Sequence, residues 1–378
     1  MEIKVQTITS EGIGGRNIFH PKVGLHPSGR LYMSLQTIGS GDYYGPVEYC
    51  VSDDNGYTWS VPEAVPTLGW LELKGYELSN EGVCDTVVNY DFATGAMVFV
   101  GHNAYYTHGR HMDTLGHWSK EDYAPELKRR GVYSALRKDG TWAPRQIFEP
   151  AEFARNISFV CGNGQRIVRP NGDWLIAFYG EEFDHHPFCF VTVYRARFNG
   201  DSFELFERGN ILTHRVGRGL LEPSLLEFKG EVLMTLRAED GRAYCSRSRD
   251  GLEYEPIKTW KYDDGAELET SSTQQHFLCT DDRLYLTYTR RNEVNEKVVR
   301  FRAPLYIAEV EPMTMTLIRE TEQIVFPLDG DPANADTVHL SGNFMPTRLD
   351  SNHWIVTDGQ CLPVQPMTSP LKIAHITL

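Results

Sequence analysis

One pattern recurs along the chain and constrains its fold more than any other feature: an apolar strand, a tight polar turn and a second apolar strand. Each turn carries glycine, asparagine or aspartate, which tolerate the positive φ that a tight hairpin requires. β-Branched and aromatic residues flank each turn over the length of a strand. We identify six such hairpins, at His20–Gln36, Asp85–His102, Arg166–Tyr179, Glu222–Arg237, His276–Arg290 and Asn343–Asp358.

Six sheet units with almost no helical periodicity indicate a closed all-β fold. The best helical candidate, Ser119–Arg130, is polar and interrupted by Pro125, so we expect only a short loop helix there. A four-stranded propeller blade takes roughly 40–50 residues, and the wider spacing of these hairpins leaves room for longer loops. We therefore predict one domain over residues 1–378, a six-bladed β-propeller, with seven blades as the alternative if one degenerate copy escapes the count.

The charge balance restricts the partners that such a protein can have. The chain has 37 Lys and Arg residues against 51 Asp and Glu residues, a formal net charge of −14. This charge disfavours nucleic acid and anionic membrane surfaces, and no apolar run approaches the length of a membrane helix. A small basic pocket remains compatible with the charge, and oligomer formation is left open.

The cysteines and the N-terminal residues bear on compartment and cofactors. The seven cysteines form no C-x-x-C pair, and the first residues do not resemble a signal peptide. We expect reduced, mostly buried thiols in a cytoplasmic protein, with a secreted mature form as the open alternative. No glycine-rich phosphate loop and no metal-binding histidine spacing stands out, so we expect neither a cofactor nor a metal.

A second signal comes from the segment Ser52–Trp59, which fits the pattern S-x-D-x-G-x-T-W. Serine and aspartate side chains can cap the backbone of a tight turn, glycine can take a conformation closed to other residues, and tryptophan can pack beneath. Shorter relatives of this pattern lie at Ser248–Tyr254 and Lys138–Trp142. We interpret these turns as structural rather than catalytic.

With these turns and hairpins, the chain resembles the sialidase superfamily of Asp-box, or BNR-repeat, β-propellers. The stretch Leu221–Leu225, followed by Leu233–Arg237, resembles the sialidase blade that carries a glutamate and a substrate-binding arginine. Ser272–His276 and Tyr288–Arg290 resemble stretches of bacterial sialidase-like proteins. The resemblance implies a carbohydrate-active hydrolase. The chain departs from the family where sialidases carry an R-I-P motif, because Phe19–Val23 offers only a lysine, and no counterpart of the tyrosine nucleophile stands near the last hairpin.

The propeller geometry itself nominates a site. The innermost strand of each blade lines the central axis, so the ends of the six hairpins should converge on one mouth of the channel. We predict that this mouth gathers catalytic acid–base groups, namely Glu222, Asp85, His102 and His276. We predict that substrate is bound by Arg166, Arg237, Arg290, His20, Lys22, Gln275 and Tyr105. Guanidinium groups bind carboxylates bidentately, which favours an acidic sugar.

Three functions are compatible with these residues. The leading hypothesis is a glycoside hydrolase that releases a terminal acidic sugar from an oligosaccharide or polysaccharide. The alternative is a polysaccharide lyase that cleaves beside a uronic acid by β-elimination, with His102 and Tyr105 or Tyr106 as proton-transfer groups. The third is a non-catalytic propeller that binds glycans.

Overall fold

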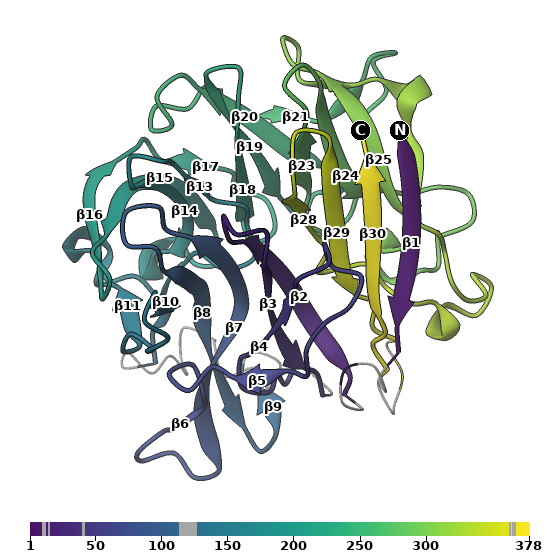
Figure 1. The fold of residues 1–378 in the computed structure, drawn as a ribbon. Coiled ribbons are helices and arrows are strands. Elements are labelled where there is room, and N and C mark those ends of the chain that lie inside the picture. The colour runs from purple at the N-terminus through teal and green to yellow at the C-terminus, as the bar shows by residue number, and fades with distance from the viewer. Residues whose placement is uncertain (10–12, 14–15, 40–41, 113–126, 363, 365–367) are drawn as a thin grey trace.

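The structure is a computed structural model that describes residues 1–9, 13, 16–39, 42–112, 127–362, 364 and 368–378. Within these residues the regular secondary structure is almost entirely β-strand, in sheets set around a common centre in a β-propeller arrangement (Figure 1). The remaining helical elements are single 3-10 turns: η3 (Ala151–Phe153), η4 (Phe183–His185), η5 (Val299–Phe301), η6 (Arg319–Thr321) and η7 (Ala335–Thr337).

The strands form five hydrogen-bonded sheets among the described residues. The first contains β2 (Ile18–Leu25), β3 (Leu31–Thr37), β4 (Glu48–Ser52) and β5 (Glu63–Ala64). The largest contains β6 (Leu71–Glu72), β7 (Ser79–Tyr90), β8 (Met97–Thr107), β9 (Arg110–His111), β10 (Arg129–Leu136), β11 (Gln146–Phe148), β12 (Ser158–Val160), β13 (Ile167–Val168), β14 (Asp173–Glu181), β15 (Cys189–Phe198), β16 (Phe203–Arg208) and β17 (Leu212–Thr213).

Three further sheets complete the arrangement. One contains β18 (Leu221–Phe228), β19 (Glu231–Arg237), β20 (Ala243–Ser248) and β21 (Lys258–Thr259). The next contains β22 (Lys261–Tyr262), β23 (His276–Cys279), β24 (Leu284–Thr289), β25 (Leu305–Glu311), β26 (Thr316–Leu317) and β27 (Gln323–Phe326). The last contains β1 (Glu2–Ile8), β28 (Met345–Arg348), β29 (His353–Gly359) and β30 (Leu371–Thr377).

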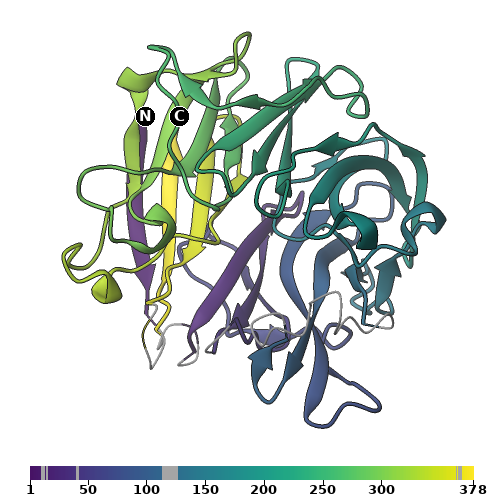
Figure 2. The same cartoon turned by 180° about the vertical axis from the view of Figure 1, so that it is seen from behind.

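All six predicted hairpins are antiparallel strand pairs: β2–β3, β7–β8, β13–β14, β18–β19, β23–β24 and β28–β29. The inner strands lie beside one another around the centre, with β2 next to β7 and β28, and β18 next to β14 and β23. The two ends of the chain meet in one sheet, because β1 pairs with β30 along its whole length. Figure 2 shows the same closure from behind, with the two termini side by side.

The hairpin turns follow the predicted chemistry in four cases and depart from it in two. Gly29, Gly95, Gly172 and Gly230 all have positive φ. The turns at Asp282 and Asn352 do not use positive φ at these residues. Instead the Thr280 hydroxyl accepts hydrogen bonds from the following backbone N–H groups, and the Asp350 carboxylate does the same in the last hairpin. A side-chain acceptor thus replaces the left-handed residue.

The turn at 52–59 forms through the side chains that its pattern singled out. Ser52 Oγ donates to Asp54 Oδ1 at 2.7 Å and accepts from the Gly56 N–H at 2.9 Å. Asp54 also accepts from the backbone and the hydroxyl of Thr58, and the Trp59 indole donates to the Gly56 carbonyl at 3.0 Å. These contacts hold the end of β4 and involve no residue of the site described below.

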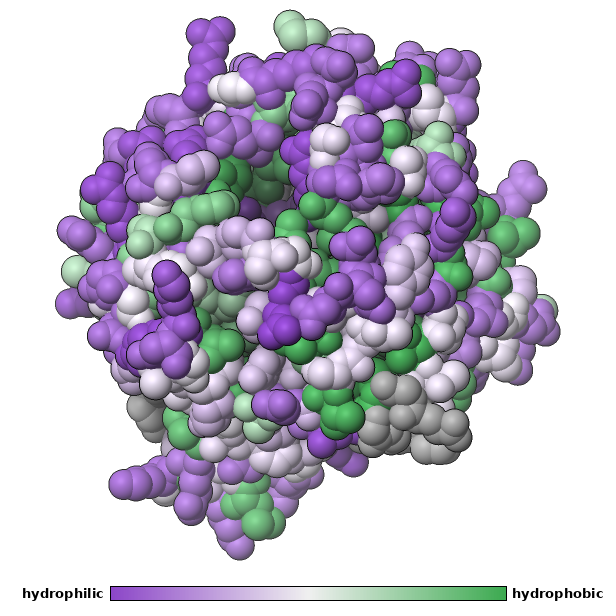
Figure 3. Space-filling model, viewed as in Figure 1, coloured by the Kyte–Doolittle hydropathy of each residue, from purple (hydrophilic) through white to green (hydrophobic). Residues whose placement is uncertain are grey.

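The core lies between the sheets. Its largest fully buried side chains include Trp174 and Trp260. All seven cysteines are free thiols and six of them are buried, as expected from the sequence. None of the described helices is long and apolar enough to span a membrane. The face in Figure 3 is mostly hydrophilic with scattered apolar residues. Most of the predicted helix at Ser119–Arg130 lies outside the described residues, and its last two residues begin β10.

Candidate active site

Three inner strands share one irregularity. The pairing of β2 with β3, of β7 with β8 and of β18 with β19 skips two residues of the inner strand. The first skipped residues are His20 in β2, Asp85 in β7 and Glu222 in β18, and their φ angles are 52°, 54° and 43°. Non-glycine residues rarely adopt positive φ, and such backbone strain concentrates at functional sites. The bulges therefore single out three side chains from three hairpins.

These three side chains line one cavity of about 550 Å³. The wall is unusually rich in charged and titratable groups. It includes His20, Asp42, Tyr44, Cys84, Asp85, His102, His111, Arg129, Tyr179, Glu181, His186, Arg218, Glu222, Arg237, Glu239, Arg300, Arg302 and Asn343. Such a concave polar site on a rigid β scaffold is suited to a small polar ligand.

One wall, which we call the arginine wall, is built from Arg218, Glu222, Arg237, Glu239, Arg300 and Arg302. Arg237 donates to Glu222 Oε1 at 2.6 Å and to Ser272 Oγ through two further nitrogens. Burial alone would raise the pKa of Glu222, but the Arg237 guanidinium holds it below its ordinary value. Glu222 is therefore an ionised carboxylate in a largely buried position.

Arg218 and Glu239 form a second pair on this wall. Arg218 donates to Glu239 Oε1 at 2.6 and 2.9 Å, and the same oxygen accepts from Ser272 Oγ at 3.1 Å. Burial opposes ionisation, but the contacts with Arg218 lower the pKa of Glu239 to about 2. Ser272 joins the two pairs, since it also contacts Arg237.

Arg300 and Arg302 differ from these paired arginines. Within the described part of the chain neither has a carboxylate at ion-pair distance, and Arg302 donates only to Thr273 Oγ1 and the Ser272 carbonyl. Burial, together with the neighbouring Arg237 and Arg300, lowers the pKa of Arg302 to about 10. This wall thus holds positive charge that its own carboxylates do not neutralise.

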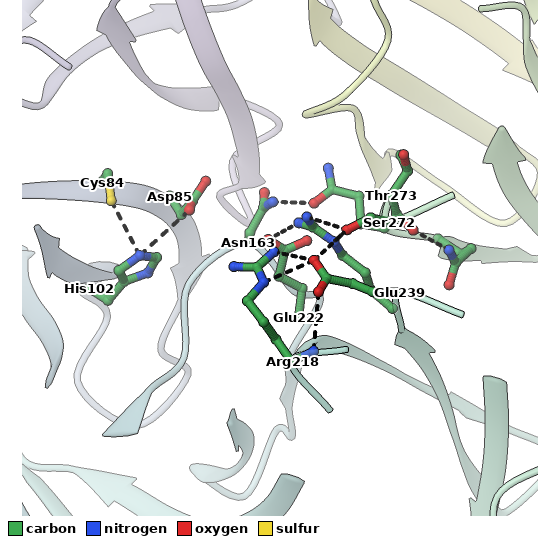
Figure 4. Close-up of polar contacts among 12 residues, drawn as sticks. Cys84, Asp85, His102, Asn163, Arg218, Glu222, Glu239, Ser272 and Thr273 are labelled. Carbon is green, nitrogen blue, oxygen red and sulfur yellow. Dashed lines mark hydrogen bonds and ion pairs between the residues drawn. The ribbon is translucent and has the colours of Figure 1, made fainter. Parts of the chain in front are cut away.

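The opposite wall, which we call the histidine wall, is built from His20, Cys84, Asp85 and His102. Figure 4 shows the last three. His20 Nε2 lies 3.1 Å from Asp85 Oδ1, and His102 Nε2 lies 3.7 Å from Asp85 Oδ2 and 3.3 Å from Cys84 Sγ. Burial lowers the pKa of both imidazoles. For His20 this effect outweighs the Asp85 carboxylate, which raises the pKa. A Cβ at Gly162 would lie 2.3 Å from His102 Nδ1, so glycine makes room for this group.

A buried polar layer lies beneath the two walls. The Lys22 ammonium donates to the Asn343 carbonyl at 2.6 Å, and burial lowers its pKa to about 8. Burial raises the pKa of Asp358 to about 7. His276 Nδ1 lies 2.9 Å from Ser224 Oγ.

The structure brings together five of the predicted site residues, because Glu222, Asp85, His102, Arg237 and His20 all line the cavity. The other six predicted site residues do not line this cavity. Lys22, His276 and Gln275 are fully buried below it, and the last accepts a hydrogen bond from Thr235 Oγ1.

The remaining three are held by other contacts. The Arg166 guanidinium donates to the carbonyls of Val100 and Cys161. Arg290 pairs with Glu322 beside a separate surface pocket. Tyr105 donates to the Lys128 carbonyl. Arg166 does not line the cavity because the third hairpin presents Asn163 (φ 65°), three residues earlier, toward the centre.

Sequence reasoning missed most of the arginine wall. Arg218, Arg300 and Arg302 come from connections between hairpins, as do Asp42 and Tyr44, so reasoning from strand ends could not nominate them. The one usable signal was the R-F-R triplet at 300–302, where two cations stand two residues apart.

Comparisons with known proteins identify the fold. No protein-family model and no curated protein matches the chain. Trypanosoma rangeli sialidase in complex with sialic acid superposes with a TM-score of 0.63 at 14% identity, over 95% of this chain and 54% of that one. A Hadza microbial sialidase gives a TM-score of 0.64 at 13% identity, over 96% and 66%.

A protein of unknown function from Dyadobacter fermentans matches over 99% of both chains, with a TM-score of 0.62 and 16% identity. The chain thus spans about half the length of the trypanosomal enzyme and the full length of the bacterial protein. At these identities the likeness concerns the fold. The chain has the sialidase-like β-propeller fold.

Proposed function

We propose that the protein is a glycoside hydrolase that releases a terminal acidic sugar from a glycan. The observation that carries the proposal is the positive charge of Arg300 and Arg302 beside the Arg237–Glu222 pair. A sugar carboxylate placed there would gain charge-assisted hydrogen bonds and relieve the repulsion between the arginines. The sialidase-like fold, in which the trypanosomal neighbour is seen with sialic acid, supports this assignment.

Hydrolysis of a glycosidic bond needs a stabilising carboxylate and a proton donor on opposite sides of the sugar. Glu222 is ionised and held by Arg237, which suits it to stabilise the positive charge that develops at the anomeric carbon. On the opposite wall, Asp85 in its protonated form is the carboxylic acid that can deliver a proton to the leaving oxygen, with His20 and His102 beside it. The cavity separates these groups, so a sugar ring can lie between them.

We also infer that the sheets are six blades of one domain. The largest sheet is joined across its middle by the short parallel contact of β10 with β12, at Arg129–Ser158 and Arg130–Phe159. Dividing that sheet at this contact leaves one sheet for each of the six hairpins.

The test uses fluorogenic glycosides of sialic acid and of uronic acids, with the matching neutral glycosides as controls. The proposal expects release of a free, saturated acidic sugar and no turnover of the neutral compounds. Equal turnover of both, or binding of acidic glycans without any product, would contradict it.

One observation favours a second candidate, a lyase that acts beside a uronic acid. His102 is kept neutral by burial, as a general base must be, and Tyr44 and Tyr179 line the same cavity. Neither tyrosine predicted for this role, Tyr105 or Tyr106, lines the cavity, so Tyr44 or Tyr179 would take the role. Digestion of polyuronates that generates the ultraviolet absorbance of an unsaturated uronate would support the lyase and exclude the hydrolase.

A further inference from the structure

The histidine wall gathers four side chains of the kinds that bind transition metals. Cys84 Sγ, an Asp85 carboxylate oxygen and His102 Nε2 all lie within 4.8 Å of one another. The fourth, His20, lies outside this cluster and places Nε2 3.1 Å from Asp85 Oδ1. We propose that Cys84, Asp85 and His102 form a zinc site whose fourth position opens into the cavity.

The local backbone explains how two consecutive residues can face one centre. In a regular strand, Cys84 and Asp85 would point to opposite faces of the sheet. The bulge at Asp85, with its φ of 54°, breaks this alternation and turns both side chains toward His102. Figure 4 shows the three side chains pointing toward one another.

The distances between the donor atoms fit a tetrahedral ion. Zinc bonds of 2.0–2.3 Å give tetrahedral edges of about 3.3–3.7 Å. Cys84 Sγ lies 3.3 Å from His102 Nε2, which lies 3.7 Å from Asp85 Oδ2, and the ligand atoms of the three residues are all within 4.8 Å of one another. A mixed thiolate, imidazole and carboxylate set suits zinc better than magnesium or calcium, which select oxygen ligands.

His20 lies beside the three ligands, next to the Asp85 carboxylate. Its Nε2 is 3.1 Å from Asp85 Oδ1, whereas His102 approaches Oδ2. The Gln36 amide nitrogen donates to the carbonyls of Gly45 and Val83, both at 2.7 Å, which turns Gln36 Oε1 toward His20 Nδ1 at 3.4 Å. Outer partners that orient a ligating side chain in this way are typical of metal sites.

The proposal goes beyond the proposed hydrolase and does not rest on it. With an ion bound, this wall would supply a Lewis acid in place of a free acid–base pair. All four residues line the cavity, so an ion can reach them from solvent.

The test is a metal titration of the full chain after dialysis against a chelator, with Co²⁺ as the spectroscopic probe and Zn²⁺ as the competitor. We expect one equivalent of Co²⁺ to bind with the strong visible bands of tetrahedral cobalt and a thiolate-to-cobalt charge-transfer band, and Zn²⁺ to abolish both. Cys84→Ser should remove the charge-transfer band. His102→Gln should weaken binding about a hundredfold.

Cys361→Ser is the matched control, because this thiol does not line the cavity, and it should leave the spectrum unchanged. Thermal unfolding verifies that each variant is folded, and if Cys84→Ser does not fold, the affinity of His102→Gln decides. The absence of saturable binding, or binding that neither variant alters, would overturn the site. Since no step reads activity, the result is independent of the proposed hydrolase.

Discussion

The two walls of the cavity handle charge in opposite ways. On the arginine wall, Glu222 and Glu239 are each paired with a guanidinium, while Arg300 and Arg302 add cations that lack such a partner among the described residues. On the histidine wall, the Asp85 carboxylate faces two imidazoles that burial keeps neutral. One wall therefore attracts an anion, and the other is arranged to accept a proton or a cation.

This difference has a consequence for a bound sugar. Charged groups act most strongly where water is excluded and their positions are fixed in advance. A carboxylate held by the arginine wall would orient the rest of the ring toward Asp85 and His102. The backbone strain at Glu222 and Asp85 fits this view, because both bulges aim a carboxylate into the space between the walls.

The largest expected effect is the loss of turnover in Glu222→Gln. The amide keeps the shape of the side chain and a hydrogen bond with Arg237, but it cannot stabilise a developing positive charge. We expect kcat to fall about 10³-fold with little change in the binding of an acidic sugar. Steady-state kinetics with the fluorogenic substrates measures the fall.

Glu239→Gln is the matched control for this change. Glu239 lies on the same wall and is paired with Arg218, but its place in the proposed mechanism is only to hold that arginine. We expect a much smaller loss of kcat. Equal losses in both variants would remove the distinction between the two carboxylates.

Arg302→Met should weaken acidic ligands and stabilise the free protein. The arginine has no carboxylate partner among the described residues, and burial beside other cations lowers its pKa to about 10. We expect about a hundredfold weaker binding of an acidic sugar, since charge-assisted hydrogen bonds contribute about 1.5–3 kcal/mol. We expect unfolding of the free protein to require about 1 kcal/mol more, because an uncompensated charge is removed. Calorimetric titration and chemical denaturation give the two values.

Arg290→Met provides the contrast. Arg290 is paired with Glu322 and lies outside the cavity, so its removal should leave binding unchanged and slightly lower the stability. If both variants were less stable than the wild type, the charge of Arg302 would have to be balanced by a partner that the described contacts do not show.

The layer below the walls should make stability depend on pH. The pKa of Asp358 is raised by burial from the ordinary 3.8 to about 7, so the folded protein holds this proton more tightly than the unfolded chain. Stability from this group is present at low pH and is lost as pH rises from about 4 to about 7. Lys22 has the opposite effect above this window. Burial lowers its pKa to about 8, so stability from this group increases as pH rises above about 8.

Asp358→Asn should flatten the loss between pH 5 and pH 7. The amide cannot ionise, so the variant should be more stable than the wild type at pH 7 by on the order of 2 kcal/mol and similar to it at pH 4.5. Urea denaturation at several pH values measures the difference. A parallel pH dependence in the two proteins would show that another group causes it.

The hairpins were predictable and the site was predictable only in part, for a physical reason. Strand pairs and turns follow from local patterns, and all six hairpins formed where those patterns placed them. Glu222, Asp85 and His20 were found because they stand at hairpin starts. Arg302 was not found, because it lies in a connection between strands. Tertiary packing brings that connection to the cavity, and such packing produces no repeating pattern in the sequence. Arg166 was misplaced because a strand start read from the sequence is uncertain by a few residues, which is enough to turn a side chain away from the axis.

The smallest expected effect concerns Tyr105, the residue that sequence placed in the site and structure places outside it. Its hydroxyl donates to the Lys128 carbonyl at 2.8 Å and accepts from Asn103 at 3.0 Å. Tyr105→Phe should therefore cost about 1 kcal/mol of stability and leave KM and kcat unchanged. Tyr179→Phe, which alters a hydroxyl of the cavity wall, should change KM or kcat several-fold with a similar stability cost. If Tyr105→Phe also changed the kinetics, the cavity would have to extend past the histidine wall to the end of β8, and the separation between the two walls would no longer define the site.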